Sequence, residues 1–311
     1  MDNLTHLRTF CSLVVRKYTS PEWLSTDKLA EEFLSHYIDI PLKNFPVDMA
    51  TLSAVARACG ATVSPHRMPG KLRGYHEVID GNRVNIYYRE DDSLSGKENT
   101  ILHELREIME PFFAGFCSSY NPLSIRALHR EADRFAAAVL LPQGPFRDKV
   151  YETGLDIPAL GQFYAKSHAQ ILLRIGEVLH GERFFYGAVY DAEPGFVPIF
   201  RVSYWAGSAN QDIPEANFYG PRGFLPRKGK SAELDSLVEM AADCRRPCHV
   251  KRIFFSEDED NDLTAIAQPV VNGEDISRVN LLVLLHLDRK LLKPLLERVR
   301  PITVASFDGH L

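Results

Sequence analysis

Hydrophobic positions in the first sixty residues recur every three or four residues, a spacing typical of amphipathic helices. The apolar positions of the first such helix are Leu4, Leu7, Phe10, Cys11, Val14 and Val15. A second helix is expected after a cap at Ser25 or Thr26, and a third over residues 49–59 after a cap at Asp48. The N-terminal region is therefore predicted to be helical.

The hydrophobic period changes to alternation between Val63 and Tyr88, where short strands are expected. Residues 80–82 read Asp-Gly-Asn, a signal for a turn between two strands. Val84 and Ile86 then alternate with more polar neighbours, as expected of a strand with one buried face.

Helical spacing returns after a polar loop over residues 90–96. Two long helices are expected, over residues 97–113 and 123–141, and a proline ends the second. Two shorter helices are expected within residues 154–179, around a turn at 166–168.

The C-terminal part of the chain is rich in predicted strands, with one helix between them and another at the end. The strands are expected over residues 184–190, 197–205, 263–271 and 279–287, and the helices over 231–242 and 290–299. A stretch rich in Gly, Pro and Arg over 217–230 is typical of a loop. The change in pattern places the main domain boundary near Gly181.

The composition is that of an ordinary globular protein, with 45% hydrophobic and 25% charged residues in a chain of 311. This length suggests two domains. The net charge of −5 gives no overall basic surface for nucleic acid, and five cysteines are too few for a disulfide scaffold. The N-terminus lacks the positive segment of a secretion signal, and the longest apolar run, Leu281–Leu285, is much shorter than a membrane helix. We therefore expect a cytoplasmic protein without a membrane partner.

The candidate chemistry lies in the first long helix, where residues 103–107 read His-Glu-Leu-Arg-Glu. Residues four apart on a helix are separated by about 40° around its axis, so His103 and Glu107 can present an imidazole and a carboxylate to one metal ion. Glu104 is offset towards a water that the metal would activate. This is the geometry of a zincin helix with glutamate in place of the second histidine. The pattern alone also fits a solvated face on which Arg106 pairs nearby carboxylates.

The next helix strengthens the metal interpretation. Residues 129–142 read His-Arg-Glu-Ala-Asp-Arg-Phe-Ala-Ala-Ala-Val-Leu-Leu-Pro. With this stretch the chain resembles the ImmA/IrrE family of metallopeptidase-like regulators, in which a His-Glu-x-x-His helix precedes a helix reading roughly Glu-x-Glu-Ala-x-x-Phe-Ala-x-x-Leu-Leu-x-Pro. Residues 72–75 and 84–87 fit the strands that come before the active helix in that family. The resemblance covers about residues 45–180.

The resemblance implies His103 as the first metal ligand, Glu104 as the general base and Glu131 as the third ligand. His129 is expected on the surface or behind the ligands, because it lies about 200° from Glu131 around the helix. The chain departs from the family at Glu107, where histidine is usual. If Glu107 ligates the one divalent ion, one imidazole and two carboxylates shift the preference from zinc towards manganese or iron. Otherwise the metal is lost and the domain is a binding scaffold.

Two functions follow from these alternatives. With metal, the resemblance implies a metal-dependent endopeptidase that cleaves a protein partner, typically a helix-turn-helix repressor, in a regulatory or stress response. Val84–Arg89 is then the candidate edge strand for the substrate, although an internal strand is the equal alternative. Without metal, the chain is a regulatory module that binds a transcription factor or a small ligand without proteolysis.

The expected fold class is α+β. The resemblance implies a zincin-like helical domain with a small antiparallel or mixed sheet over residues 1–145. A helical, helix-turn-helix-like connector over 146–181 and an α/β GAF-like sensor domain over 182–311 complete the chain. Arg174 is the only strongly basic residue in the second connector helix, so DNA is not expected as a partner.

The GAF-like resemblance rests on the order of strands and helices alone. It implies a small-molecule effector for the C-terminal domain, although no ligand motif is present there. The aromatic candidates for such a pocket, which fit an ordinary core equally well, are Tyr186, Tyr190, Tyr204 and Trp205.

Overall fold

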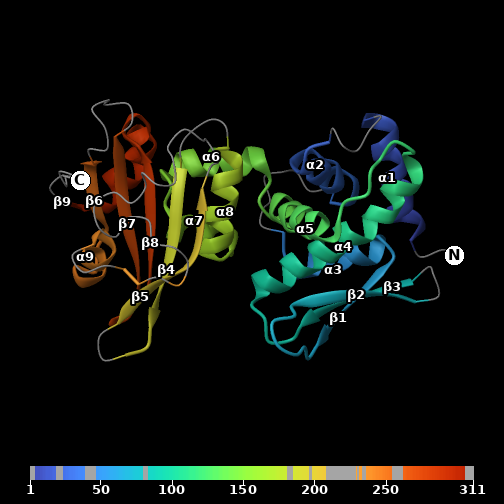
Figure 1. The fold of residues 1–311 in the computed structure, drawn as a ribbon, viewed down its shortest axis with the longest axis horizontal. Coiled ribbons are helices and arrows are strands. Elements are labelled where there is room, and N and C mark those ends of the chain that lie inside the picture. Colours follow the sequence, from blue (N-terminus) through green and yellow to red (C-terminus); the bar gives the residue numbers. More distant parts are fainter. Residues whose placement is uncertain are drawn as a thin grey trace. The chain divides into compact units, whose positions relative to one another are not determined.

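The computed structural model of the chain is shown in Figure 1. It describes residues 4–18, 24–38, 47–79, 83–180, 185–195, 198–207, 229, 231–232, 236–253 and 262–304. Contacts divide the chain into two compact units, Met1–Phe146 and Arg147–Leu311. The expected turn at 80–82, the boundary residue Gly181 and nearly all of the loop over 217–230 lie outside the described residues.

The first unit contains the helices that the sequence predicts. They are α1 (Thr5–Tyr18), α2 (Thr26–Tyr37), α3 (Met49–Ala58), α4 (Leu94–Phe116) and α5 (Ile125–Leu140). The side chains of Ser25 and Asp48 accept hydrogen bonds from the first turns of α2 and α3, which confirms both predicted caps. Ser93 caps α4 in the same way through Gly96 N at 3.1 Å. The last residues of the predicted loop over 90–96 are therefore helical.

A three-stranded sheet accompanies these helices. It consists of β1 (Ala61–His66), β2 (Gly74–Ile79) and β3 (Arg83–Arg89), in the order β1-β3-β2. The central strand β3 is parallel to β1 and antiparallel to β2. The interpretation of Val84–Arg89 as an edge strand is therefore wrong, because both sides of β3 are paired. β2, which packs beside α4, is an edge strand of this sheet.

The long helix α4 forms the centre of the first unit. It contacts α1, α3 and α5 as well as strands β2 and β3. Its apolar stripe is completely or almost completely buried and consists of Ile101, Leu102, Leu105, Met109 and Phe113. This burial holds the remaining faces of α4 in a defined direction, so the side chains of residues 103, 104 and 107 have defined neighbours.

The predicted connector helices belong to the second unit. The boundary in sequence between the two units falls within α6 (Gln143–Thr153). α7 (Ile157–Tyr164) and α8 (His168–Val178) follow it and pack on the strands of the second unit. Gln268 on one of these strands accepts a hydrogen bond from Ile157 N and donates one to Leu155 O, both at 3.1 Å. The boundary expected near Gly181 is therefore corrected to Phe146–Arg147, the start of the connector. The Arg174 side chain is buried and pairs with Glu177 at 3.0 Å, so it is not presented to a phosphate backbone.

A six-stranded sheet organises the rest of the second unit. Its strands are β4 (Phe185–Glu193), β5 (Ile199–Gly207), β6 (Cys248–Ile253), β7 (Leu263–Asn272), β8 (Asp275–Leu285) and β9 (Ile302–Val304). The order is β5-β4-β8-β7-β6-β9, and neighbours are antiparallel except for the parallel pair β6 and β9. The sequence did not predict the two strands β6 and β9.

Helices accompany both faces of this sheet. Leu172 of α8 packs near Gly187, whereas α9 (Leu237–Asp243) buries Leu237 and Ala241 in the core that contains Ala188. Because neighbouring strand residues point to opposite faces, α8 and α9 lie on opposite sides of β4. The 3-10 helix η4 (His286–Leu292) and α10 (Lys293–Val299) replace the single helix expected over 290–299.

The two units together confirm the α+β class, since each combines helices with a sheet that contains antiparallel pairs. In the parts of the chain that the structure describes, no helix combines the length and apolarity needed to cross a membrane.

Buried His249 makes the second unit sensitive to acid. Burial, and then the charges of Arg289 and Lys251, lower the pKa of its imidazole from 6.5 to about 4. The unfolded chain therefore binds a proton more readily than the folded chain between these values, so stability is complete above about pH 6.5 and is lost as the pH falls towards 4. Between pH 7 and pH 5 we expect the free energy of unfolding to fall by about 2 kcal/mol because of this residue.

The measurement is chemical denaturation at both pH values, with amide hydrogen exchange of β6 and β7 to locate the effect. His249→Gln is the matched control, because its amide can still donate to Thr264 Oγ1, which lies 3.2 Å from His249 Nε2, but does not titrate. An equal loss of stability in both proteins would contradict the assignment to His249.

Candidate metal centre

The predicted pair on α4 comes together in the structure. His103 Nε2 lies 3.0 Å from Glu107 Oε1, and both side chains are largely buried. This is the arrangement expected for residues one helical turn apart. The ion pairs of Glu107 are with imidazoles, whereas Arg106 binds Glu110 at 3.0 Å on another side of α4. The alternative in which Arg106 pairs the carboxylates of a solvated face is not what the structure contains.

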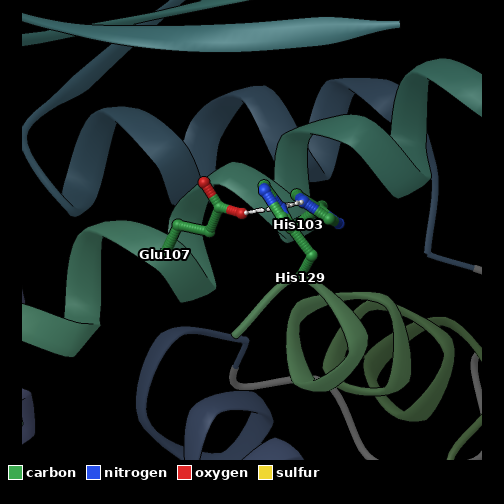
Figure 2. Close-up of side chains that lie close together, drawn as sticks. All are labelled: His103, Glu107 and His129. Carbon is green, nitrogen blue, oxygen red and sulfur yellow. Dashed lines mark hydrogen bonds and ion pairs between the residues drawn. The ribbon is translucent and has the colours of Figure 1, made fainter. Parts of the chain in front are cut away.

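The third side chain of this group is His129 of α5. Its Nδ1 lies 2.5 Å from Glu107 Oε1 and 3.3 Å from His103 Nε2. Figure 2 shows the three side chains close together. The two imidazole rings are stacked, with centroids 5.5 Å apart. His129 was expected on the surface, and its side chain is indeed half exposed, but it points at the α4 pair rather than away from it.

The structure does not bring Glu131 to this group. Its carboxylate binds Thr26 Oγ1 at 2.5 Å, in the first turn of α2, and Arg134 Nη1 at 2.9 Å. His129 and Glu131 are about 200° apart on α5, so only one of them can face α4. They flank the buried stripe of α5 on opposite sides, and the sequence gives no sign of which side meets α4 and which meets α2.

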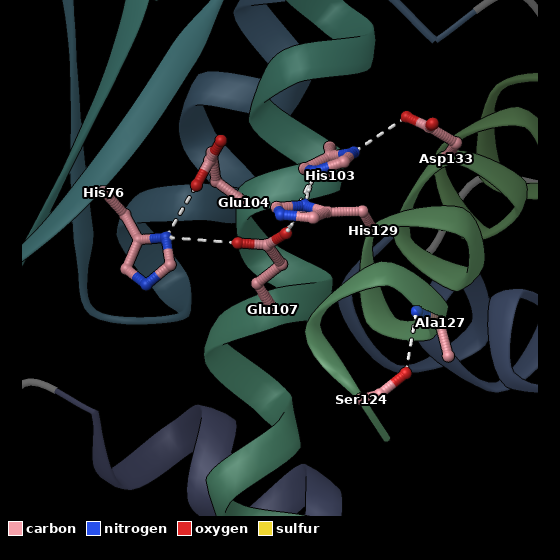
Figure 3. Close-up of polar contacts among 8 residues, drawn as sticks. All are labelled: His76, His103, Glu104, Glu107, Ser124, Ala127, His129 and Asp133. Atoms are coloured by element: carbon pink, nitrogen blue, oxygen red, sulfur yellow. Dashed lines mark hydrogen bonds and ion pairs between the residues drawn. The ribbon is translucent and has the colours of Figure 1, made fainter. Parts of the chain in front are cut away.

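Asp133 orients the His103 ring from behind. Its Oδ1 lies 2.8 Å from His103 Nδ1, so this nitrogen donates to the carboxylate and Nε2 is left to face Glu107 and His129 (Figure 3). A carboxylate behind an imidazole in this way is the usual outer partner of a metal-binding histidine. Asp133 follows His129 by one helical turn, so the same face of α5 supplies both groups.

The two carboxylates change the acidity of His103. Burial alone would lower the pKa of the imidazole, but its hydrogen bonds with Asp133 and Glu107 outweigh burial and raise the pKa to about 10. Burial would likewise raise the pKa of Glu107, but His103 and the other nearby imidazoles hold it below its usual value. Without a metal, His103 is thus protonated at neutral pH, and a bound cation would take the place of that proton.

A third element of the first unit, strand β2, contributes His76, which sequence reasoning missed. His76 lies on the edge strand β2, and its Nδ1 is 2.6 Å from Glu104 Oε2 and 4.0 Å from Glu107 Oε2 (Figure 3). Glu104 itself is buried. The predicted base is therefore held against the sheet, on the side of Glu107 away from His103 and His129.

Close contact between β2 and α4 places His76. A Cβ atom at Gly74 would lie 2.1 Å from Thr100 Cγ2 of α4 and 2.8 Å from the Tyr87 carbonyl oxygen. Gly74 and His76 are two residues apart on a strand, so they share the face that meets α4. The absent side chain at Gly74 lets β2 lie close enough for His76 to reach Glu104.

A buried ionic cluster positions the start of α5. Glu110 accepts hydrogen bonds from Arg106 Nη1 at 3.0 Å, from the Tyr120 hydroxyl at 2.7 Å and from Leu123 N at 2.9 Å. The last contact comes directly before Ser124, whose side chain caps α5 through Ala127 N. The path from α4 to the helix that carries His129 is thus tied to α4 itself.

The geometry of His103 Nε2, His129 Nδ1 and Glu107 Oε1 fits a divalent cation. Nitrogen and oxygen ligands about 2.0–2.1 Å from a tetrahedral zinc ion are about 3.3 Å from one another. The three donor atoms are separated by 2.5, 3.0 and 3.3 Å, close to one face of such a tetrahedron. The set has two imidazoles and one carboxylate, in place of the one imidazole and two carboxylates that the sequence led us to expect.

Comparison with known proteins gives a similarity in fold. The chain matches no protein-family model and no curated protein sequence. Among solved structures, it is similar to a Mycobacterium tuberculosis transcriptional regulator, with a TM-score of 0.55 and 12% sequence identity over 97% of this chain and 89% of that one. At this identity the similarity concerns the fold alone.

Substituting Gly74 tests the contact that places His76. We expect Gly74→Ala to lower the free energy of unfolding by roughly 1–3 kcal/mol, because the new methyl group must push β2 away from α4. Chemical denaturation measures the change. Gly115→Ala is the matched control in α4, because a Cβ there has no neighbour within 4 Å and should stabilise the helix by up to about 1 kcal/mol. A Gly74→Ala protein as stable as the natural one would show that this contact is not tight.

Proposed function

We propose that the first unit is a metal-dependent endopeptidase with one divalent ion held by His103, Glu107 and His129. The observation that carries this proposal is the convergence of His103 Nε2, His129 Nδ1 and Glu107 Oε1 within 3.3 Å of one another, beside the buried carboxylate of Glu104. Two histidines and one glutamate are a ligand set of catalytic zinc sites in peptidases. Zinc is therefore the first choice for this centre, ahead of the manganese or iron that a second carboxylate would favour.

The exchange of residue types between α4 and α5 supports retention of the metal. In the ImmA/IrrE pattern that the chain resembles, histidine stands at the position of Glu107 and glutamate at the position of His129. This chain has the reverse at both positions. With the third ligand at position 129, which faces Glu107, instead of at Glu131, the centre again has two imidazoles and one carboxylate. Loss of the metal alone would not explain why histidine stands at position 129.

When bound, the ion would supply Lewis-acid activation of a water molecule and of the scissile carbonyl group. Glu104 would accept the proton of that water, since its carboxylate lies next to the ligands without being among the three donors. His76 positions Glu104 through the 2.6 Å contact, and Asp133 keeps His103 Nε2 directed at the centre. These roles need a fixed geometry, which burial of α4 provides.

The edge strand β2 offers a place for the substrate. Its outer side is not occupied by another strand of this sheet, and an extended peptide can pair with such an edge through its main chain. The substrate class is therefore an extended segment of a protein, and the family resemblance suggests a helix-turn-helix repressor cleaved in a regulatory or stress response. The same resemblance suggests a small-molecule effector for the second unit, although Tyr190, one candidate for its pocket, is part of the buried core.

A regulatory module without proteolysis is the second candidate function. Its support is the similarity in fold to a transcriptional regulator. Such a module would recognise a transcription factor or small ligand through the same surfaces. The two candidates differ in what they require of Glu104, because only a peptidase needs its carboxylate as a base.

Metal analysis distinguishes the ligand His129 from its neighbour Glu131. We expect the purified protein, after dialysis against Zn²⁺, to contain about one tightly held ion per chain in elemental analysis. His129→Ala should lose this ion, because one of three protein ligands is removed. Glu131→Gln is the matched control on the same helix and should retain it. Absence of metal after supplementation with zinc, manganese and iron would contradict the proposal.

Substitution of the base tests the chemistry separately. Glu104→Gln preserves the shape of the side chain but cannot accept a proton, so peptide hydrolysis should fall by at least about 10²-fold while the tightly held ion remains. The assay is mass spectrometry of a peptide mixture incubated with the zinc-loaded protein. Unchanged regulatory activity of this variant in cells would instead favour the module without proteolysis.

A further inference from the structure

The two oxygens of Glu107 face two different groups of side chains. Oε1 contacts His103 and His129, at 3.0 and 2.5 Å, whereas Oε2 faces His76 Nδ1 at 4.0 Å. His76, Glu104 and Glu107 also form a group whose donor atoms all lie within 4.8 Å of one another. Figure 3 shows this group on the side of Glu107 that faces the sheet, opposite His129.

We propose that His76, Glu104 and Glu107 form a second, weaker site for a divalent cation, and that Glu107 bridges the two ions. This inference rests on the proposed function for its first site, which it extends from one ion to two. The donors are His76 Nδ1, Glu104 Oε2 and Glu107 Oε2. Each comes from an element that the core holds in place, β2 or α4.

The charges at this second group favour a cation. Two carboxylates lie close together here, and Glu104 is only 6% exposed, so water screens their repulsion poorly. His76 is the one imidazole on this side, because His103 and His129 face the other oxygen of Glu107. A divalent ion would offset the repulsion between the two carboxylates, and it would use all three side chains as ligands.

The ligand types indicate which ion the second site takes. One imidazole and two carboxylates are a harder ligand set than the two imidazoles and one carboxylate of the first site. Manganese, iron and cobalt are therefore relatively better suited to the second site than to the first. A shared carboxylate is compatible with a separation of about 3.5–4 Å between the ions, the range found in two-metal hydrolases. The second ion binds more weakly, because the donors are spread more widely: His76 Nδ1 lies 4.0 Å from Glu107 Oε2, whereas no donor pair of the first group is more than 3.3 Å apart.

Occupation of the second site has a consequence for the reaction. Glu104 would hold the second ion with the oxygen that faces His76, and its carboxylate would be a poorer proton acceptor in that state. Excess metal should therefore inhibit an enzyme that the first ion activates. His76 then has two roles, as the positioning residue for Glu104 in the one-ion form and as a ligand in the two-ion form.

Cobalt binding to the full-length protein tests this inference. Co²⁺ alone is titrated into metal-free protein, with calorimetry to count the ions and electron paramagnetic resonance to detect magnetic coupling through a shared carboxylate. We expect two equivalents with distinct affinities, and a coupled spectrum when both are bound. His76→Ala should weaken the second equivalent by more than the roughly 10–100-fold typical of residues behind a ligand, and the first equivalent should stay bound.

Two further variants keep the result interpretable. Glu104→Gln should also remove the second equivalent of cobalt. Because this variant keeps the His76 ring in the sheet, the same result in both variants would exclude a folding defect as the cause. His66→Ala is the control, because His66 makes edge-to-face contacts with Tyr75 and Tyr87 of the same sheet but is not one of the donors, and this variant should bind two equivalents.

The outcomes separate the second site from the first. One equivalent in the natural protein, unchanged by His76→Ala, would overturn the second site and leave the proposed peptidase centre intact. Two equivalents without magnetic coupling would overturn the bridging role of Glu107. No bound cobalt at all would overturn both the inference and the proposed function.

Discussion

The packing of α5 against α4 brings polar side chains of the two helices into contact. Ala136 follows His129 and Asp133 by seven and three residues, so the three share one face of α5, and Ala136 is completely buried. The same packing buries the apolar stripe of α4 and brings His129 to Glu107. The free energy that stabilises the first unit is therefore also what holds the side chains of the candidate metal centre together. An unfilled gap between these helices would cost both stability and the site.

The parts of the site that lie on one helix could be predicted, because helical geometry alone relates them. His103 and Glu107 are such a pair, and their contact follows from a spacing of four residues. The choice between His129 and Glu131 could not be made, since it depends on which side of α5 meets α4. His76 was also out of reach, because its contact with Glu104 depends on the pairing of β2 with β3 and on the close approach at Gly74.

The fold shows the same division between local and non-local information. Capped helices such as α2 and α3 were predicted to within a few residues, because the cap and the apolar stripe are both local signals. The position of β3 in the middle of its sheet was not, since an alternating pattern does not tell an edge strand from a central one. The connector helices were found, but their membership in the second unit depends on long-range contacts such as Gln268 with Ile157.

Because His76 lies on the edge strand β2, the proposed binding of a peptide is linked to the proposed binding of a cation. In the proposed peptidase, a peptide that pairs with β2 would hold that strand in place, and a cation bound through His76 would depend on the same strand. Thermodynamic linkage requires that whatever factor peptide binding adds to cation affinity, cation binding adds to peptide affinity. In the proposed peptidase, a substitution in β2 that alters peptide binding would therefore also alter cation binding.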